Sequence, residues 1–194
     1  MGSTLNLEIG LACNGIIHGE PPSEVMVEIA RILRVDHAGE TGAIQIYRAQ
    51  IFLSRLLYPD IVPILAEMLE HEQAHQKVFS DLLRKRGIRT CYALRLWSLG
   101  GYLLGVITSL LGRNSIWVCT NAIESTVLLH LKEQISFLRN IDSEAYSAVC
   151  SIKSDEESHQ QIGMANQNKG LLSVLVIALV KYSTTFAIWL SIKL

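Results

Sequence analysis

Hydrophobic residues fill long stretches of the chain, and proline, glycine and asparagine interrupt these stretches at only a few places. No stretch shows the run of alternating β-branched residues, bounded by turns, that is typical of a β-strand. The pattern therefore predicts an all-α protein. Six helices are expected, and they cover residues 23–57, 61–85, 92–111, 115–138, 143–166 and 171–192.

Two of the expected helices are apolar on nearly all sides. Residues 96–112 contain no charged side chain, and residues 171–192 contain one, Lys181. Such helices are either buried core helices or segments that insert into one leaflet of a membrane. A basic cluster precedes the first of them: Arg84, Lys85, Arg86, Arg89 and Arg95. Two apolar helices with a cationic flank exceed the needs of a soluble core, so we expect attachment to a membrane surface.

Composition narrows the possible classes of protein. With 194 residues, 49% of them hydrophobic, we expect one domain over residues 23–194, after an N-terminal segment of residues 1–22. The net charge is −1, so the chain lacks the basic field that binds a nucleic-acid backbone, which excludes nucleic acid as a partner. The first thirty residues contain no Lys or Arg, which fits neither a secretory signal nor a transit peptide and favours a bacterial source.

Two Glu-x-x-His pairs are the first candidates for chemistry. Glu72 with His75, and Glu156 with His159, lie three residues apart, so each pair projects from one face of its helix and can chelate one ion. A single such pair is weak support, because the same pattern arises often on solvated helix surfaces.

Two isolated glutamates strengthen the case. Glu124 is the only charged residue in the apolar stretch 115–131, and burying an unpaired carboxylate is costly unless it binds a metal or a cation. Glu40 lies between Gly39 and Gly42, which suggests either close backbone approach or open space around its side chain. A surface turn is the competing interpretation for Glu40.

The spacing of these residues reveals an internal repeat. Glu40 precedes Glu72 by 32 residues, Glu124 precedes Glu156 by 32 residues, and the two halves are offset by 84 residues. Each half predicts an antiparallel helix pair with a single Glu facing a Glu-x-x-His pair. Two such pairs, packed as a four-helix bundle, match the ferritin-like di-iron and di-manganese carboxylate proteins. In that arrangement Glu72 and Glu156 would bridge two ions, with Glu40 and His75 on one ion, and Glu124 and His159 on the other.

At these residues the sequence resembles the demethoxyubiquinone hydroxylase family. The similar segments are RVDHAGETGA at 34–43, the Glu72–His75 pair, NAIE at 121–124 and DEESH at 155–159, in the same order. The resemblance implies a ferritin-like four-helix bundle with two additional apolar membrane-associated helices. It also implies that six residues are both metal ligands and catalytic residues: Glu40, Glu72, His75, Glu124, Glu156 and His159.

The resemblance further implies the reaction and its participants. The expected enzyme is a di-iron monooxygenase that binds two iron ions per chain and hydroxylates a polyprenyl methoxy-methyl-benzoquinol in ubiquinone biosynthesis, with O2 and NADH-derived electrons. The quinol and membrane lipid are its expected partners, and other ubiquinone-biosynthesis proteins or a second copy of the chain remain open. Its expected location is the cytoplasmic face of a bacterial plasma membrane, the alternative being the matrix face of the mitochondrial inner membrane.

Four further residues near the expected site have smaller expected roles. Asp36 and Asp155 are candidates for orienting the imidazoles, although an acid beside a ligand is more often only a solvated neighbour. Tyr47, seven residues after Glu40, is expected to pack in the core, and a relay of electrons or protons is the alternative. His130 is also expected to pack in the core.

Two rival functions remain open. His71 and His75 enclose Glu72 in the HExxH pattern of zinc metalloproteases, which would make both histidines zinc ligands. That scheme leaves Glu40, Glu124 and the second Glu-x-x-His pair unexplained. In the di-iron scheme His71 is rotated by about 100° from Glu72 and is expected to be peripheral. A non-catalytic ferritin-like iron-binding protein would share the bundle without needing two apolar helices.

Overall fold

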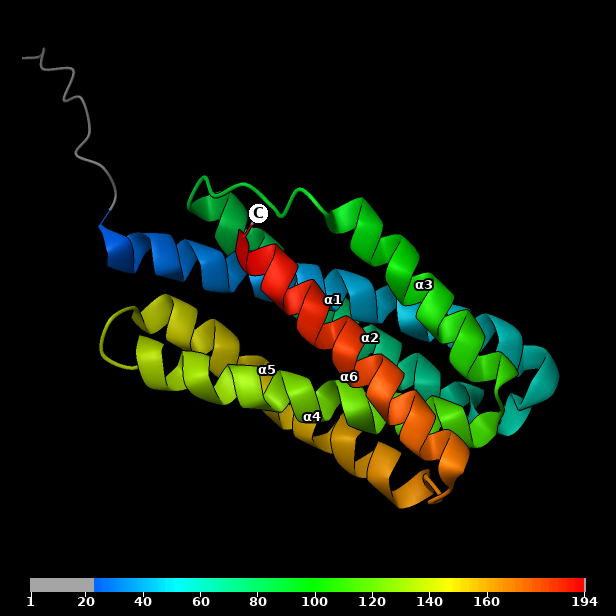
Figure 1. Ribbon diagram of the computed structural model, residues 1–194. Helices are drawn as coiled ribbons and strands as arrows, with labels where there is room; N and C mark the ends of the chain where they lie inside the picture. The colour runs from blue at the N-terminus through cyan, green and yellow to red at the C-terminus, as the bar shows by residue number, and fades with distance from the viewer. Residues whose placement is uncertain (1–22, 194) are drawn as a thin grey trace, which may run out of the picture.

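A computed structural model describes residues 23–193, which form six α-helices, one short 3-10 helix and no strand (Figure 1). The elements are α1 (Glu24–Leu57), η1 (Pro59–Ile61), α2 (Val62–Lys85), α3 (Leu94–Leu110), α4 (Arg113–Leu138), α5 (Ser143–Asn166) and α6 (Leu171–Lys193). The all-α prediction is confirmed, and every helix end lies within two residues of its expected place. The expected N-terminal segment 1–22 lies outside the described residues.

Local chemistry explains where the helices begin and end. The Ser23 side chain accepts a hydrogen bond from the Met26 amide and so caps the start of α1. Pro59 opens the short 3-10 helix after α1, because a proline has no amide proton to continue the preceding helix. Gly87 follows α2 with a φ of 63°, a left-handed conformation that glycine adopts without strain.

The helices pack as three layers of two. α2 and α5 form one outer layer, α1 and α4 form the middle layer, and α3 and α6 form the other outer layer. In Figure 1, α6 crosses the front of the bundle. α1, α2, α4 and α5 thus make a helical bundle, and α3 and α6 cover one of its sides.

Two hydrophobic clusters fill the bundle on either side of its middle. One includes Leu33, Phe79 and Leu138 from α1, α2 and α4. The other includes Leu65 and Trp117 from α2 and α4. Along each of the four helices, the expected site residues lie between residues of one cluster and residues of the other. The packed apolar ends therefore hold the middle of the four helices in register.

Glycines bring α3 unusually close to α1. A Cβ atom on Gly101 would collide with the Gly42 carbonyl, and a Cβ atom on Gly105 would collide with the Ile46 carbonyl. Close backbone approach, one of the two interpretations of the glycines around Glu40, is therefore confirmed at Gly42. Gly39 differs, because a Cβ atom there would meet no atom within 4 Å.

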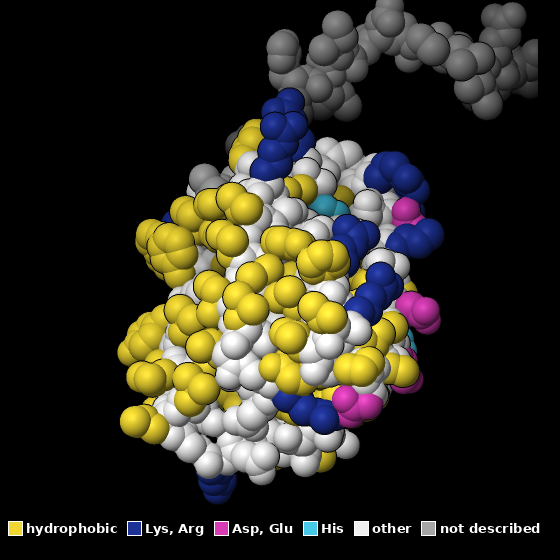
Figure 2. Space-filling view, turned by 90° about the vertical axis from the view of Figure 1, so that its right-hand side faces the viewer, with side chains coloured by type: hydrophobic (Ala, Val, Ile, Leu, Met, Phe, Trp, Pro, Cys, Tyr) yellow, Lys and Arg dark blue, Asp and Glu magenta, His cyan; other side chains and the backbone are white. Residues whose placement is uncertain are grey.

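The two apolar helices differ from each other, and the expectation of two membrane helices is corrected to one. Among the described residues, α6 alone is long and apolar enough to cross a membrane by length and composition, with a window of mean hydropathy 1.9 of which 17% is buried. α3 has only 17 residues. Figure 2 shows hydrophobic side chains over much of one face of the molecule. On α6 an exposed stripe contains Leu175, Leu179, Tyr182, Phe186 and Trp189.

The basic cluster before α3 is largely neutralised by the protein itself. Arg84 pairs with Asp81, Lys85 pairs with Glu144, and Arg86 pairs with Asp142. Within residues 23–193 no ion pair includes Arg89 or Arg95. Any cationic flank for a membrane surface is therefore smaller than the sequence suggested.

Asp142 is expected to stabilise the bundle through two contacts. Its Oδ1 accepts hydrogen bonds of 2.9 Å from the Ala145 amide, which caps α5, and from Arg86 Nη2 on the turn after α2. Asp142→Ala removes both, and we expect a loss of about 1–2 kcal/mol in the free energy of unfolding, measured by urea denaturation. Asp142→Asn is the matched control, because asparagine also caps helices well, and it should lose less.

The same carboxylate predicts a pH dependence. The hydrogen bond from Arg86 holds the pKa of Asp142 at about 2, below its ordinary value of 3.8. A lowered pKa in the folded state stabilises the protein above the ordinary value, and this stabilisation is lost as the pH falls toward 2. Asp142→Asn should therefore differ from the unmodified protein at pH 6 and approach it near pH 2. An equal difference at both pH values would contradict the assignment.

Candidate metal centre

All six expected site residues converge in the middle of the bundle. Four helices supply them: Glu40 from α1, Glu72 and His75 from α2, Glu124 from α4, and Glu156 and His159 from α5. Each of the six residues is at most 6% exposed. The structure thus places four carboxylates and two imidazoles together in a buried position, as the repeat in the sequence predicted.

The six residues form two overlapping groups that can each hold a cation. One group consists of Glu40, Glu72, His75 and Glu156, and the other of Glu72, Glu124, Glu156 and His159. Within each group, one potential ligand atom of every residue lies within 4.8 Å of the others. Glu72 and Glu156 belong to both groups, so the carboxylates of the two Glu-x-x-His pairs lie where bridging ligands would lie.

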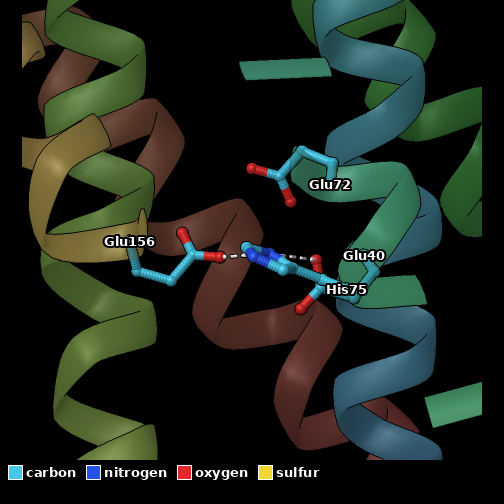
Figure 3. A group of neighbouring side chains, drawn as sticks. All are labelled: Glu40, Glu72, His75 and Glu156. Atoms are coloured by element: carbon cyan, nitrogen blue, oxygen red, sulfur yellow. Dashed lines mark ion pairs between the residues drawn. The ribbon is translucent and has the colours of Figure 1, made fainter. Parts of the chain in front are cut away.

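The imidazoles point into the groups through their Nδ1 atoms. His75 Nδ1 lies 3.0 Å from Glu156 Oε1 and 3.8 Å from Glu40 Oε2, so that it stands between these two carboxylates (Figure 3). His159 Nδ1 lies 3.3 Å from Glu72 Oε1 and 3.6 Å from Glu156 Oε2. Each histidine therefore approaches the carboxylate of the opposite helix pair.

The site contains more carboxyl groups than its two imidazoles could neutralise, and this imbalance changes the pKa values of its members. Burial raises the pKa of Glu40 and Glu124 well above the ordinary value, and the nearby Glu72 and Glu156 raise both further. Burial alone would also raise the pKa of Glu156, but contacts with His159 and His75 outweigh it and hold that pKa at about 2. Burial lowers the pKa of His159, but Glu156 and Glu72 outweigh it and raise the pKa to about 9.

Unpaired atoms inside the site fit bound metal ions. Glu72 Oε1, Glu156 Oε2, His75 Nδ1 and His159 Nδ1 are buried, and their close contacts do not have hydrogen-bond geometry. Among the described residues, no Lys or Arg pairs with any of the four carboxylates. Buried carboxylates without a cation are costly, and oxygen-rich sets with imidazole suit iron or manganese, so the residues present fit two such ions.

Three neighbours contact the site residues, and the sequence indicated one of these contacts. Tyr47, for which packing was the main expectation, is buried and donates a hydrogen bond of 3.2 Å to Glu124 Oε1. Asp155 Oδ2 lies 3.1 Å from His75 Nε2, in the orienting position that the sequence suggested. His71, expected to be peripheral, belongs to neither group but contacts His159 Nε2 through its Nδ1 at 3.1 Å. Helical spacing alone does not reveal contacts between residues on different helices.

The other two neighbours have roles that differ from the sequence interpretation. Asp36 does not contact an imidazole, because its Oδ1 accepts a hydrogen bond of 2.7 Å from Gln134 while its Oδ2 makes none. Burial raises the pKa of Asp36 to about 7, against the lowering effect of Gln134. His130 is half-buried and lines a cavity instead of packing in the core.

That cavity leads from the site toward the outer layer formed by α3 and α6. It has a volume of about 420 Å³ and is lined mostly by apolar residues of α1, α3, α4 and α6. Glu40, Glu72, Glu124 and Glu156 line its inner end. The cavity therefore gives the four buried carboxylates a largely apolar approach from the side of α3 and α6.

Comparison with known proteins identifies the family. Residues 27–191 match the family described as "Ubiquinone biosynthesis protein COQ7". The chain belongs to this family. The match covers α2 to α5 completely and α1 and α6 except for their outer ends, and it confirms the resemblance that the sequence motifs indicated.

Individual relatives cover most of the chain. A Rhodospirillum rubrum protein named "3-demethoxyubiquinol 3-hydroxylase" is 32% identical over 174 residues, which cover 89% of this chain and 81% of the relative. A human protein named "NADPH-dependent 3-demethoxyubiquinone 3-hydroxylase, mitochondrial" is 31% identical over 171 residues, which cover 86% and 78%. A Dictyostelium discoideum protein of the same name is 32% identical over 169 residues, which cover 85% and 77%.

The names of two of these relatives differ from the expectations drawn from the sequence in two respects. The human and Dictyostelium names specify NADPH, whereas the family resemblance implied electrons from NADH. The same two names specify the mitochondrion, whereas the sequence analysis favoured a bacterial membrane.

Proposed function

We propose that this chain is a demethoxyubiquinol hydroxylase of ubiquinone biosynthesis that uses O2 and two iron ions held by the six buried residues. Membership of the COQ7 family and the names of the hydroxylase relatives support the reaction. The observation that carries the proposal is the pair of overlapping ligand groups at the inner end of an apolar cavity.

The residues of the site would divide the work as their positions suggest. Glu72 and Glu156 would bridge the ions, with Glu40 and His75 completing one position and Glu124 and His159 the other. Two bound iron ions would supply the activation of O2 for insertion of an oxygen atom into the ring. The remaining tasks belong to the protein, which must admit an apolar quinol, orient its ring and keep water away.

The cavity suits those tasks. Ile46, Ile123 and Val127 provide apolar walls next to the carboxylates, so a ring placed there is removed from water. Asp36 lies in the same wall, and its Oδ2 makes no hydrogen bond. Burial raises the pKa of this carboxyl, so it can hold a proton in the lining of the cavity. The electrons would come from a nicotinamide cofactor, NADPH according to the relatives' names or NADH as the family resemblance implied.

Two measurements test the proposal. The full chain, reconstituted with ferrous iron without oxygen, should bind two iron ions. Cells lacking their own hydroxylase should convert demethoxyubiquinone to ubiquinone when they express the chain. Binding of one ion or none, or accumulation of demethoxyubiquinone despite good expression and iron loading, would reject the proposal. Chains with Glu72→Ala and Glu156→Ala together serve as the inactive control.

The structure favours neither rival function. A zinc protease requires His71 and His75 on the same cation, but His71 lies against His159 and outside both ligand groups. An iron-storage protein needs no apolar cavity that leads to the carboxylates. Quinol turnover by the iron-loaded protein separates the hydroxylase from iron storage, and the ratio of bound iron to zinc separates it from the protease.

We also propose that the face formed by α3 and α6 attaches the protein to a membrane surface. An insoluble polyprenyl quinol must come from a bilayer, and the cavity lies beneath these two helices. Exposed apolar residues on this face include Leu99 on α3 and Leu175 on α6, which are 58% and 60% exposed. The location on the cytoplasmic side of a bacterial membrane remains a prediction.

Charged substitutions on that face should release the protein from vesicles. Leu99→Glu with Leu175→Glu should weaken binding to phospholipid vesicles about tenfold or more, because burying one leucine contributes ~1.5–3 kcal/mol. Neither residue lines the cavity, so the iron content should not change. Met164→Glu on α5 is the control, since Met164 is 55% exposed in the opposite layer. Equal vesicle binding by both variants, or release by salt without detergent, would contradict insertion.

A further inference from the structure

Behind each candidate histidine ligand stands a residue from the opposite half of the repeat. Asp155 immediately precedes Glu156, His71 immediately precedes Glu72, and the two are offset by the same 84 residues as the ligands. Asp155 on α5 contacts His75 on α2, and His71 on α2 contacts His159 on α5. The repeat therefore extends to the outer contacts of the site, but the residue type differs between the halves.

The two contacts have the same geometry. In each case the histidine turns Nδ1 toward the carboxylates and Nε2 outward. Nε2 of His75 lies 3.1 Å from Asp155 Oδ2, and Nε2 of His159 lies 3.1 Å from His71 Nδ1. Both outer partners are thus within hydrogen-bond distance of the nitrogen that a metal would leave free.

The contact between His71 and His159 is edge to edge. The two rings are parallel within 10° and their centres are 5.3 Å apart, whereas the two nitrogens are only 3.1 Å apart. The nitrogens therefore lie between the ring centres, which aligns a proton on one with the lone pair of the other. With Nδ1 of His159 facing a cation, Nε2 carries the proton and donates it to His71 Nδ1, so His71 is the acceptor.

The acceptors differ in the charge that they offer. A carboxylate behind a ligand histidine makes the imidazole a stronger donor to the metal and fixes its orientation. Asp155 supplies a carboxylate to His75, whereas His71 supplies an uncharged imidazole nitrogen to His159. The two halves of the site, which match in their direct ligands, therefore differ in the groups that support those ligands.

From this difference we infer that His71 is a positioning residue for His159, and that the position formed with Glu124 and His159 binds its metal more weakly than the position formed with Glu40 and His75. The inference rests on the proposed two-metal site. Neither His71 nor Asp155 belongs to a ligand group, so both act through the imidazoles.

Cobalt(II) titration of the full-length, metal-free chain tests the inference, with visible absorption as the readout. The unmodified protein should bind two ions with different affinities. His71→Leu should weaken the weaker position about 10–100-fold and leave the tighter one unchanged. In His71→Asn the weaker position should keep nearly the affinity that it has in the unmodified protein, because asparagine can place an oxygen near the position of the histidine Nδ1. His71→Asp, which copies the other half, should bring the two affinities closer together.

The outcomes separate this inference from the proposed function. If the unmodified protein binds fewer than two ions, the two-metal site itself is wrong. If it binds two ions with equal affinity, or if His71→Leu and His71→Asp both leave the affinities unchanged, only the inference is overturned. Equal weakening of both positions by His71→Leu would also overturn it, because that is the effect of a loosened bundle. Gln73→Leu, an exposed change on the same turn of α2, should alter neither affinity.

Discussion

Glu156→Gln should abolish the binding of both iron ions and reduce hydroxylation to background, whereas Glu124→Gln should remove only one ion. The reason is that Glu156 belongs to both ligand groups and Glu124 to only one. Replacing a carboxylate with an amide removes the anionic ligand but keeps the shape of the side chain. The measurement is the iron content of each variant after reconstitution without oxygen, together with quinol turnover.

Folding controls make this prediction sharper. Burial and the neighbouring carboxylates already disfavour the charged form of Glu40 and Glu124, so a neutral glutamine there should not destabilise the metal-free protein. We expect Glu40→Gln and Glu124→Gln to unfold at or above the temperature of the unmodified metal-free chain, because functional sites often reduce stability. Retention of one ion by Glu156→Gln and loss of both by Glu124→Gln would contradict the assignment of the bridging ligands.

The sequence predicted the helices well because each of their boundaries has a local chemical cause. Ser23, Pro59 and Gly87 act on the residues beside them, and such effects can be inferred without a fold. The convergence of the six candidate residues could also be predicted, because an internal repeat carries long-range information that a single motif lacks. Equal spacing of Glu40 to Glu72 and of Glu124 to Glu156 indicated that two similar hairpins face each other.

The outer contacts of the site could not be predicted from the sequence. His71 lies on a different face of α2 from Glu72, and helical spacing alone made it peripheral. The structure shows that α5 approaches α2 on that side, so that His159 meets His71. Tyr47 and Glu124 likewise come from different halves of the chain and meet only in the folded bundle. Such contacts depend on how helices cross, which residue spacing within one helix does not specify.

The two apolar helices show the opposite error, because their composition suggested more than the structure supports. α3 is as free of charge as α6 over most of its length, but it is shorter, and glycines press it against α1. Lys85 and Arg86 looked like a flank for lipid headgroups, but they pair with acids at the start of α5. A run of basic residues carries no information about the acids that a fold will place beside it.

His159→Ala should cost the protein its activity, and His71→Ala should not, when iron is supplied well above the concentration needed to fill both positions. His159 Nδ1 faces Glu72 and Glu156, so its removal takes away a ligand. His71 supports that ligand from outside, and its loss should weaken one position without emptying it. His75→Ala should match His159→Ala, and the double variant should be little worse than either, because the ligands of a two-metal site act as a unit.

The measurement is iron content and quinol turnover at saturating iron. A zinc protease would give the reverse order, since His71 and His75 would then be equivalent ligands. Loss of all metal in His71→Ala, together with normal metal content in His159→Ala, would replace the di-iron assignment with the zinc one.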